Sequence, residues 1–347
     1  MSKRGFPTWS SESMRAPREL TQYRARTWTL ATLRWGAAAL AVIMTLYSML
    51  LAFFPDSNDV LVVIMWVTVS ISLAVIVVIS SIKTRLLRER TYRPDPGHSL
   101  TIRVDDFLGS MKAYPNANVA FGAHDTFDPE ILHPNSLHAL IFENYFASSE
   151  SAAHGDYDSK VGAHDEAVTT SAGPLPLRGH YPYGTVAVLP IYKTDIRDLE
   201  ESPGVVPDSA RSKPLASDSY YQRRAYLVVN STWGKHTFSS FGNVQAVTNP
   251  LSKIVEKHRI DHDVSACLLV ALIGTGQSSS VSSMASLLTL IDEFFHQREI
   301  GRRNPFAFDP ISNIVVSLRP SELQSGTVDL EVVHQYCAAK LKAFASR

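Results

Sequence analysis

The stretch LLVALIGTGQSSSVSSMASLLTLIDEFF, residues 268–295, joins an apolar run, a turn rich in glycine and serine, and a helical pattern. A short apolar run bounded by glycine is typical of a buried strand, and the apolar spacing after the turn is typical of an amphipathic helix. We therefore predict a strand at 267–273, a turn GTGQSSS at 274–280 and a helix at 281–298.

Similar strand and helix patterns alternate from residue 99 to the C-terminus. Apolar runs predict strands at 100–104, 119–123, 185–189, 224–229 and 313–318. Helical spacing predicts helices at 136–147, 244–258 and 329–345. Strands that alternate with helices form a parallel sheet covered on both faces, so the expected fold is a three-layer α/β/α domain with a mostly parallel sheet. Polar, glycine- and proline-containing stretches at 148–180 and 194–219 are expected to be long loops.

The N-terminal part carries two apolar segments without charge, at 35–54 and 60–82. Each has about 20 residues or slightly more, enough at ~1.5 Å per residue to cross a hydrocarbon core of ~30 Å. The five residues PDSND at 55–59 join them, so a transmembrane helical hairpin is expected. A secretory signal peptide fits less well, because the apolar run is too long and a second one follows at once.

Basic residues flank the hairpin on both outer sides, in an N-terminal segment at 1–34 and a connector at 83–98. The turn between the apolar segments is acidic. By the positive-inside rule, both termini and the domain at 99–347 are expected to be cytoplasmic, in a multi-pass protein of the cell membrane.

Composition excludes several classes of protein. The 347 residues have a formal net charge of zero, which provides no basic field for nucleic acid. The two cysteines, Cys267 and Cys337, are too few for a disulfide scaffold, and Cys267 lies in an apolar run where a buried thiol is expected.

Ligands of open α/β sheets bind beyond the carboxyl ends of the strands, and three polar segments fall there. The turn at 274–280 offers glycine backbone and free N–H groups that suit a phosphate, although a plain strand-to-helix turn with a cap from Ser279 or Ser280 has the same pattern. Asp105 and Asp106 follow one strand, and GAHDTFD at 122–128 follows the next. Each of these segments is also compatible with a capped loop.

The order of these segments resembles the macro domain, an ADP-ribose-binding fold. More narrowly, it resembles the macro-domain effector of Thoeris antiphage systems, in the form with two N-terminal membrane helices. The matching stretches are DDFL at 105–108, HDTFD at 124–128, SLHA at 136–139, YPYGT at 181–185 and ALIGTGQ at 271–277. Three positions depart from the family pattern, namely His124 for asparagine, Ala139 for glycine and Gln277 for an arginine. The last departure leaves phosphate binding to backbone N–H groups and serine hydroxyls.

The resemblance implies a receptor without a cofactor rather than an enzyme. A TIR-domain partner would make an ADP-ribose-derived signal, for this form a histidine conjugate of ADP-ribose. Binding would assemble the chain into a homo-oligomer that acts on membrane lipid, disrupts the inner membrane and causes abortive infection.

The resemblance also implies roles for single residues. Asp106 is expected near the adenine amino group, and His124, Asp125 and Asp128 near the distal ribose or its amino acid. The turn at 274–280 is expected around the diphosphate. The full set of expected ligand residues is Asp106, Phe107, His124, Asp125, Phe127, Asp128, Ser136, His138, Gly184, Thr185, Gly274, Thr275, Gly276, Gln277, Ser278, Ser279 and Ser280.

Three alternatives stay open. A macro-domain hydrolase acting on ADP-ribose derivatives is one, with His124 and Asp125 as an acid/base pair. A metal site is another, on His124, His133 and His138, although their spacing matches no zinc pattern and no metal is expected. The third is a passive membrane anchor that keeps the fold without binding a nucleotide.

Overall fold

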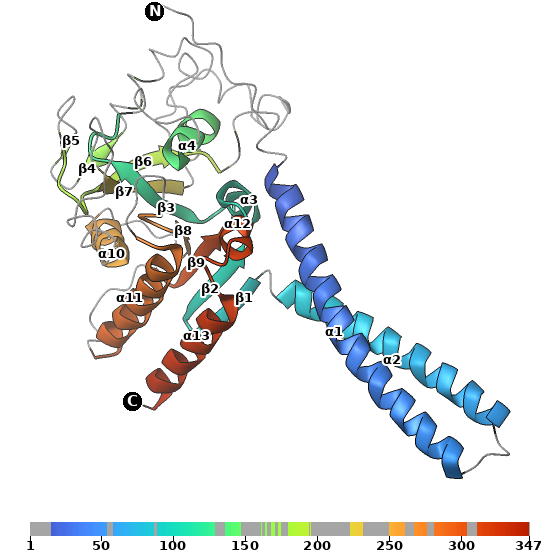
Figure 1. Ribbon diagram of the computed structural model, residues 1–347. Coiled ribbons are helices and arrows are strands. Elements are labelled where there is room, and N and C mark those ends of the chain that lie inside the picture. The colour runs from blue at the N-terminus through green and yellow to red at the C-terminus, as the bar shows by residue number, and fades with distance from the viewer. Residues whose placement is uncertain are drawn as a thin grey trace, which may run out of the picture. The chain divides into compact units, whose positions relative to one another are not determined.

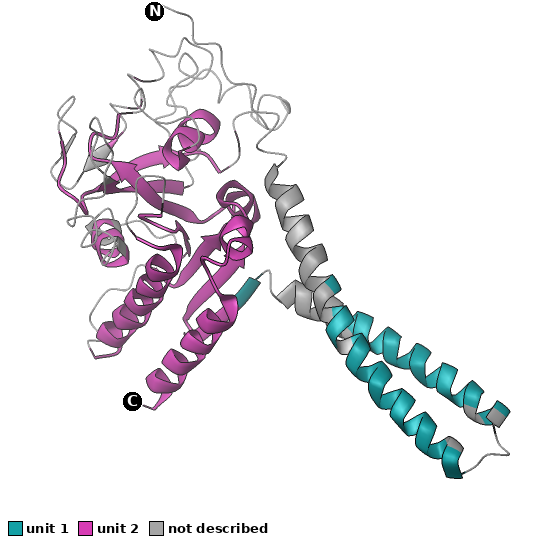
Figure 2. Ribbon diagram, viewed as in Figure 1, with its two compact units in different colours: residues 1–90 teal, residues 91–347 magenta. Residues whose placement is uncertain are grey.

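The structure of the protein is a computed structural model (Figure 1). It describes residues 15–53, 58–86, 89–128, 136–146, 161, 164, 168–170, 173–174, 180–193, 195, 223–231, 250–260, 267–275, 281–303 and 311–346. The chain divides into two compact units, residues 1–90 and 91–347, and each is described by itself (Figure 2).

Unit 1 consists of two long helices that pack against each other, α1 (Arg15–Phe53) and α2 (Asn58–Leu86). By length and composition, the segment Thr32–Leu50 of α1 is able to cross a membrane, and the apolar segment of α2, Val62–Val78, is shorter. The second helix begins within the predicted connection at 55–59. Asn58 and Asp59 belong to α2. The Asp59 carboxylate lies in its first turn, where a negative charge interacts favourably with the positive end of the helix dipole.

Unit 2 is built on a sheet of nine strands in the order β1-β2-β9-β8-β3-β7-β6-β4-β5. The strands are β1 (Glu89–Asp95), β2 (His98–Val104), β3 (Asn118–His124), β4 (Thr169–Thr170), β5 (Gly173–Pro174), β6 (Val186–Ile191), β7 (Arg223–Ser231), β8 (Cys267–Ala271) and β9 (Asn313–Leu318). The five neighbours from β2 to β7 are parallel, and β6 pairs with β7 in the antiparallel sense. The expected mostly parallel sheet is therefore confirmed.

Helices cover both faces of the sheet, which gives the expected three layers (Figure 1). Side chains alternate along a strand, so Val119, Phe121 and Ala123 of β3 point to one face. There they join a buried cluster with α3 (Phe107–Ala113) and α4 (Leu137–Tyr145). The opposite face lies against α10 (Pro250–Ile260), α11 (Ser283–Arg303) and α13 (Leu330–Ala345), whose apolar positions are also buried.

Several elements differ from the sequence prediction. The segment predicted as a connector at 83–98 holds the end of α2 and the edge strand β1, where Pro94 is tolerated because an edge strand leaves backbone groups unpaired. The described residues of the predicted loop 148–180 include β4 and β5. The helices α3 and α12 (Pro320–Gln324) were not predicted, because seven and five residues are too few for a periodic pattern.

Candidate functional site

Six strand ends meet along the side of the sheet where the parallel strands finish, which is called the sheet edge from here on. The parallel strands β2, β9, β8, β3 and β7 all end there, and the antiparallel β6 begins there. Adjacent strands lie about 4.8 Å apart, so the segments that follow them are close neighbours. The edge therefore brings together Asp105 and Asp106, the turn at Gly274, the segment from His124 to Asp128, and Gly184 with Thr185.

The two aspartates after β2 have different surroundings. Asp105 Oδ2 accepts a hydrogen bond from Arg103 Nη2 at 2.8 Å, and its Oδ1 accepts from the Asp106 backbone N–H at 3.0 Å. Asp106 is the N-cap of α3, and its carboxylate accepts from the Gly109 N–H. Burial raises the pKa of the Asp106 carboxyl, while the Gly109 N–H acts to lower it. A Cβ at position 109 would lie 2.8 Å from Asp106 Oδ1 and 2.9 Å from Asp105 Oδ1, so a larger residue there would displace these two side chains.

The segment after β3 forms a tight loop. The Phe127 N–H donates to the His124 carbonyl at 3.3 Å, and Phe127 adopts φ 53°, a conformation that a bulky residue rarely takes. The Phe127 ring is buried and packs against Tyr181 with ring centroids 5.4 Å apart. Burial lowers the pKa of His124, which favours the neutral imidazole, although Asp125 acts to raise it.

Asp125 contacts a residue that the sequence analysis did not select. His180 Nδ1 lies 2.7 Å from Asp125 Oδ2, and the Tyr181 N–H donates to the Asp125 carbonyl at 2.8 Å. The Asp125 side chain is 4% exposed and the His180 side chain 66% exposed. A buried carboxylate therefore holds an imidazole at the surface of this edge. No local pattern reveals the pair, because 55 positions separate its members.

A turn at 182–185 leads into β6. The Thr185 N–H donates to the Pro182 carbonyl at 3.1 Å, and Gly184 has φ 79°, as the third residue of a type II turn requires. The Gly184 N–H donates to the Val229 carbonyl at 2.9 Å, which fastens the turn to β7. The predicted residues Gly184 and Thr185 thus lie at the common edge.

The turn after β8 begins as predicted. Gly274 has φ 80°, which favours glycine, and Thr275 Oγ1 donates to the Leu272 carbonyl at 3.0 Å. The expected residues Gly276, Gln277, Ser278, Ser279 and Ser280 lie outside the described residues. The predicted cap is corrected: the Ser282 hydroxyl accepts from the Ala285 N–H at 3.2 Å, so α11 begins two residues later than expected.

Asn230, near the end of β7, was also missed. A Cβ on Gly122 of the neighbouring β3 would lie 2.3 Å from Asn230 Nδ2, so the amide lies directly against the Gly122 backbone. The pairing of the two strands shifts at this level, between Ala123 and His124. Such irregularities redirect side chains at the end of a strand.

Four expected ligand residues also have structural roles. The side chains of Phe107, Phe127 and His138 are 4%, 1% and 1% exposed, and therefore belong to the core. The Ser136 hydroxyl caps α4 by accepting from the Ala139 N–H at 3.1 Å. The motif SLHA thus specifies the start of a helix and a buried side chain. Asp128, by contrast, lies at the edge and is half-buried.

His138 forms a buried pair with His164. Their Nε2 atoms are 3.2 Å apart, and His138 Nδ1 has no hydrogen-bond partner among the residues that the structure describes. Burial, and next the neighbouring His164, lower the pKa of His138 well below its usual value. Within the described residues no three histidine, cysteine, aspartate or glutamate side chains converge as metal ligands. His133, a member of the metal alternative, lies outside those residues.

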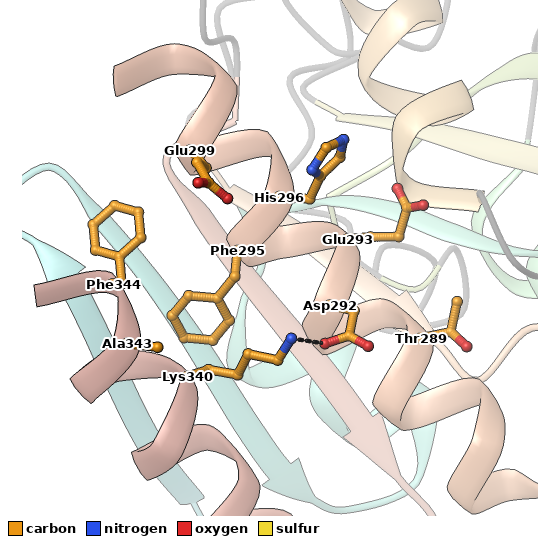
Figure 3. A pocket seen from close by; sticks show the side chains of 9 residues that line it. All are labelled: Thr289, Asp292, Glu293, Phe295, His296, Glu299, Lys340, Ala343 and Phe344. Carbon is orange, nitrogen blue, oxygen red and sulfur yellow. Dashed lines mark ion pairs between the residues drawn. The ribbon is translucent and has the colours of Figure 1, made fainter. Parts of the chain in front are cut away.

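A separate surface pocket of about 490 Å³ lies between α11 and α13 (Figure 3). Its lining combines the Phe295 and Phe344 rings with an ion pair between Lys340 Nζ and Asp292 Oδ1 at 2.6 Å. All nine lining residues belong to these two helices, and none was predicted as a ligand residue. Its carboxylates Asp292, Glu293 and Glu299 make it unsuitable for a diphosphate, so the sheet edge remains the candidate site.

A scan against known protein families finds none that matches this chain, and a search of curated proteins finds no relative.

Proposed function

We propose that this protein is a membrane-anchored receptor whose C-terminal domain binds an ADP-ribose derivative at the sheet edge. The observation that carries the proposal is the arrangement of chemically different groups along one line of strand ends. Asp106 lies at the end of β2, Gly274 at the end of β8, and the pair Asp125–His180 beyond β3. A base, a diphosphate and a distal ribose present complementary groups in that same order.

Each position suits one part of the ligand. A carboxylate is an acceptor for the adenine amino group, and a turn with a left-handed glycine allows close approach of phosphate to the backbone. The distal part of the ligand carries hydroxyls, and in a histidine conjugate an amino acid, which pair with the carboxylate and imidazole of Asp125 and His180. The resemblance to the macro-domain effector of Thoeris systems supports the same assignment.

The membrane part of the proposal is a helical hairpin with spans at 35–54 and 60–82, and with both termini and the domain in the cytoplasm. Two features support it, the apolar segment Thr32–Leu50 and the packing of α2 against α1. Binding of a signal made by a TIR-domain enzyme would assemble the chain and disrupt the membrane. For this to happen, the ligand must bind the assembled state more tightly than the free state.

The test is calorimetric titration of the full chain in detergent with ADP-ribose and with its histidine conjugate, combined with light scattering. We expect saturable binding, tighter for the conjugate, together with an increase in particle mass. The matched negative control is guanosine diphosphate-ribose, whose base offers an acceptor instead of the adenine amino group. Absence of binding of either adenine ligand would leave only the anchor.

Hydrolysis of ADP-ribose derivatives is the second candidate function. The Asp125–His180 pair favours it, because a carboxylate that accepts from Nδ1–H leaves Nε2 available as a base. Release of ADP-ribose from the conjugate by the purified chain, abolished in His180→Ala, would establish this activity. A stable complex with no product supports the receptor.

A further inference from the structure

Arg319 directly follows β9 and lies between two parts of the proposed site. In the sheet, β9 lies between β2 and β8, which lead to Asp106 and to Gly274 respectively. The Asp105 N–H donates to the Leu318 carbonyl at 2.9 Å, so the ladder continues to the residue before Arg319. With strands about 4.8 Å apart, an arginine side chain at this point can reach either neighbour.

Among the described residues that directly follow these strands, Arg319 is the only lysine or arginine. The turn GTGQSSS at 274–280 contains no lysine or arginine. Arg103 is at the same edge, but its guanidinium donates to Asp105 and its side chain is only 9% exposed. A diphosphate at Gly274 would also be near the Asp106 carboxylate, and like charges at such separations repel.

Arg319 is suited to provide a positive charge for a diphosphate at Gly274. Its side chain is exposed. Burial raises the pKa of the Asp106 carboxyl, and the positive charges of Lys112 and Arg319 act to lower it. Its backbone is held in place, since the Arg319 N–H donates to Glu322 Oε2 at 2.9 Å. The other oxygen of Glu322 accepts from the Ser283 hydroxyl at 3.1 Å, which joins this corner to the first residue of α11.

We propose that Arg319 is a phosphate-binding residue of this site, and that its guanidinium pairs with the diphosphate of the ADP-ribose derivative. The inference rests on the proposed function and adds the cation that the glycine turn lacks. A guanidinium matches phosphate oxygens in a bidentate geometry and keeps its charge at every physiological pH. Glu322 is a positioning residue, because it holds the Arg319 backbone without reaching the ligand.

The experiment is titration of the full chain in detergent with ADP-ribose and, separately, with adenosine, for wild type and for Arg319→Ala and Arg319→Lys. We expect Arg319→Ala to weaken ADP-ribose binding about ten- to hundredfold, as for a lost hydrogen bond to a charged group, and to change adenosine binding less than about twofold. Arg319→Lys should restore part of the loss. Raising the salt concentration should weaken ADP-ribose binding by wild type more than binding by Arg319→Ala.

Arg303→Ala is the matched control, because it removes the same charge from an exposed side chain in the last turn of α11. It should bind ADP-ribose as wild type does, and all variants should keep the melting temperature. If wild type binds ADP-ribose and Arg319→Ala binds it within about twofold, the role of Arg319 is refuted while the proposed function stands. If wild type does not bind, the proposed function and this inference are both refuted.

Discussion

The Asp125 carboxylate, buried at the end of β3, holds the exposed His180 imidazole at 2.7 Å. An ionised carboxylate only accepts, so Nδ1 donates and Nε2 is directed away from Asp125. The neighbouring Tyr181 fixes the same segment through its backbone and its ring. The pair thus provides an oriented imidazole at the proposed ligand edge.

His180→Ala should weaken binding of the ADP-ribose derivative about two- to tenfold, as expected for the loss of one hydrogen bond. Stability should fall by about 1–3 kcal/mol, because the substitution removes a hydrogen-bond partner of the buried Asp125 carboxylate. Titration calorimetry and thermal unfolding of the full chain measure the two effects. His98→Ala is the control, because His98 pairs with Asp95 at 2.5 Å on the turn between β1 and β2. Equal effects of the two substitutions on affinity would argue against a ligand role for His180.

Asp106→Asn separates the observed role of Asp106 as the N-cap of α3 from its proposed role as an acceptor for the adenine amino group. Asparagine keeps a side-chain oxygen for the Gly109 N–H, and asparagine and aspartate are about equally good N-caps, so stability should hold. The substituted amide turns an acceptor into a donor toward the base. We expect weaker binding of ADP-ribose and smaller discrimination against the hypoxanthine analogue, which lacks the amino group.

Competition binding with the two nucleotides checks this prediction. Asp329→Asn is the matched control, because Asp329 caps α13 with its carboxylate and is not among the expected ligand residues. Unchanged discrimination in Asp106→Asn would mean that Asp106 serves only as a helix cap.

The sequence predicted the six central strands of the sheet, from β2 to β6 in the strand order, but not β1, β4 and β5 or the side-chain contacts. The strand at 313–318 was predicted with the observed bounds, because a parallel strand buried on both faces is a continuous apolar run. The burial of Phe107 and His138 in the core was not predicted, for a related reason. A motif match fixes their position in the chain, whereas burial depends on how α3 and α4 pack on β3.

The missed site residues are all defined by contacts between distant segments. His180 meets Asp125 across 55 positions, Asn230 meets Gly122 across neighbouring strands, and Arg319 is placed by the position of β9 in the sheet. Each belongs to a residue type that is common at protein surfaces. Only the strand order shows that they share one edge.

Gly122→Ala should destabilise the domain. The added Cβ would lie 2.3 Å from Asn230 Nδ2 and 2.7 Å from its Cγ, so the amide must move. Overpacking of this kind costs about 1–3 kcal/mol. Thermal unfolding should show a lower midpoint, and the double variant Gly122→Ala with Asn230→Ala should recover much of it. If the double variant is as unstable as Gly122→Ala alone, the contact with Asn230 is not the cause.

The buried His138 predicts loss of stability in acid. Burial depresses its pKa well below 6.5 in the folded state, whereas the unfolded chain takes up a proton near the usual value of about 6.5. The unfolded state therefore binds more protons, and the stabilising contribution is present above that pH and is lost as pH falls toward the folded pKa. One proton corresponds to about 1.4 kcal/mol per pH unit.

Melting curves between pH 5 and pH 7.5 measure this slope for wild type and for His138→Gln, which cannot titrate. We expect a shallower acid limb in the variant, whatever its stability at neutral pH. His296→Gln is the control, because it makes the same change at an exposed position of the α11–α13 pocket. An acid limb of equal slope in wild type and His138→Gln would rule out His138 as its origin.

Arginines placed in α1 should release the chain from membranes. Leu40 and Met44 lie within the segment Thr32–Leu50 and are 50% and 48% exposed, as expected for side chains that face lipid. An arginine near the centre of a spanning helix costs about 2.5–3.5 kcal/mol. The double variant Leu40→Arg with Met44→Arg should therefore lose most of its carbonate-resistant membrane fraction. Val332→Arg on α13 replaces an apolar residue that is 46% exposed and should keep that fraction. A carbonate-resistant fraction equal to wild type in the double variant would show that Thr32–Leu50 is not required to anchor the chain.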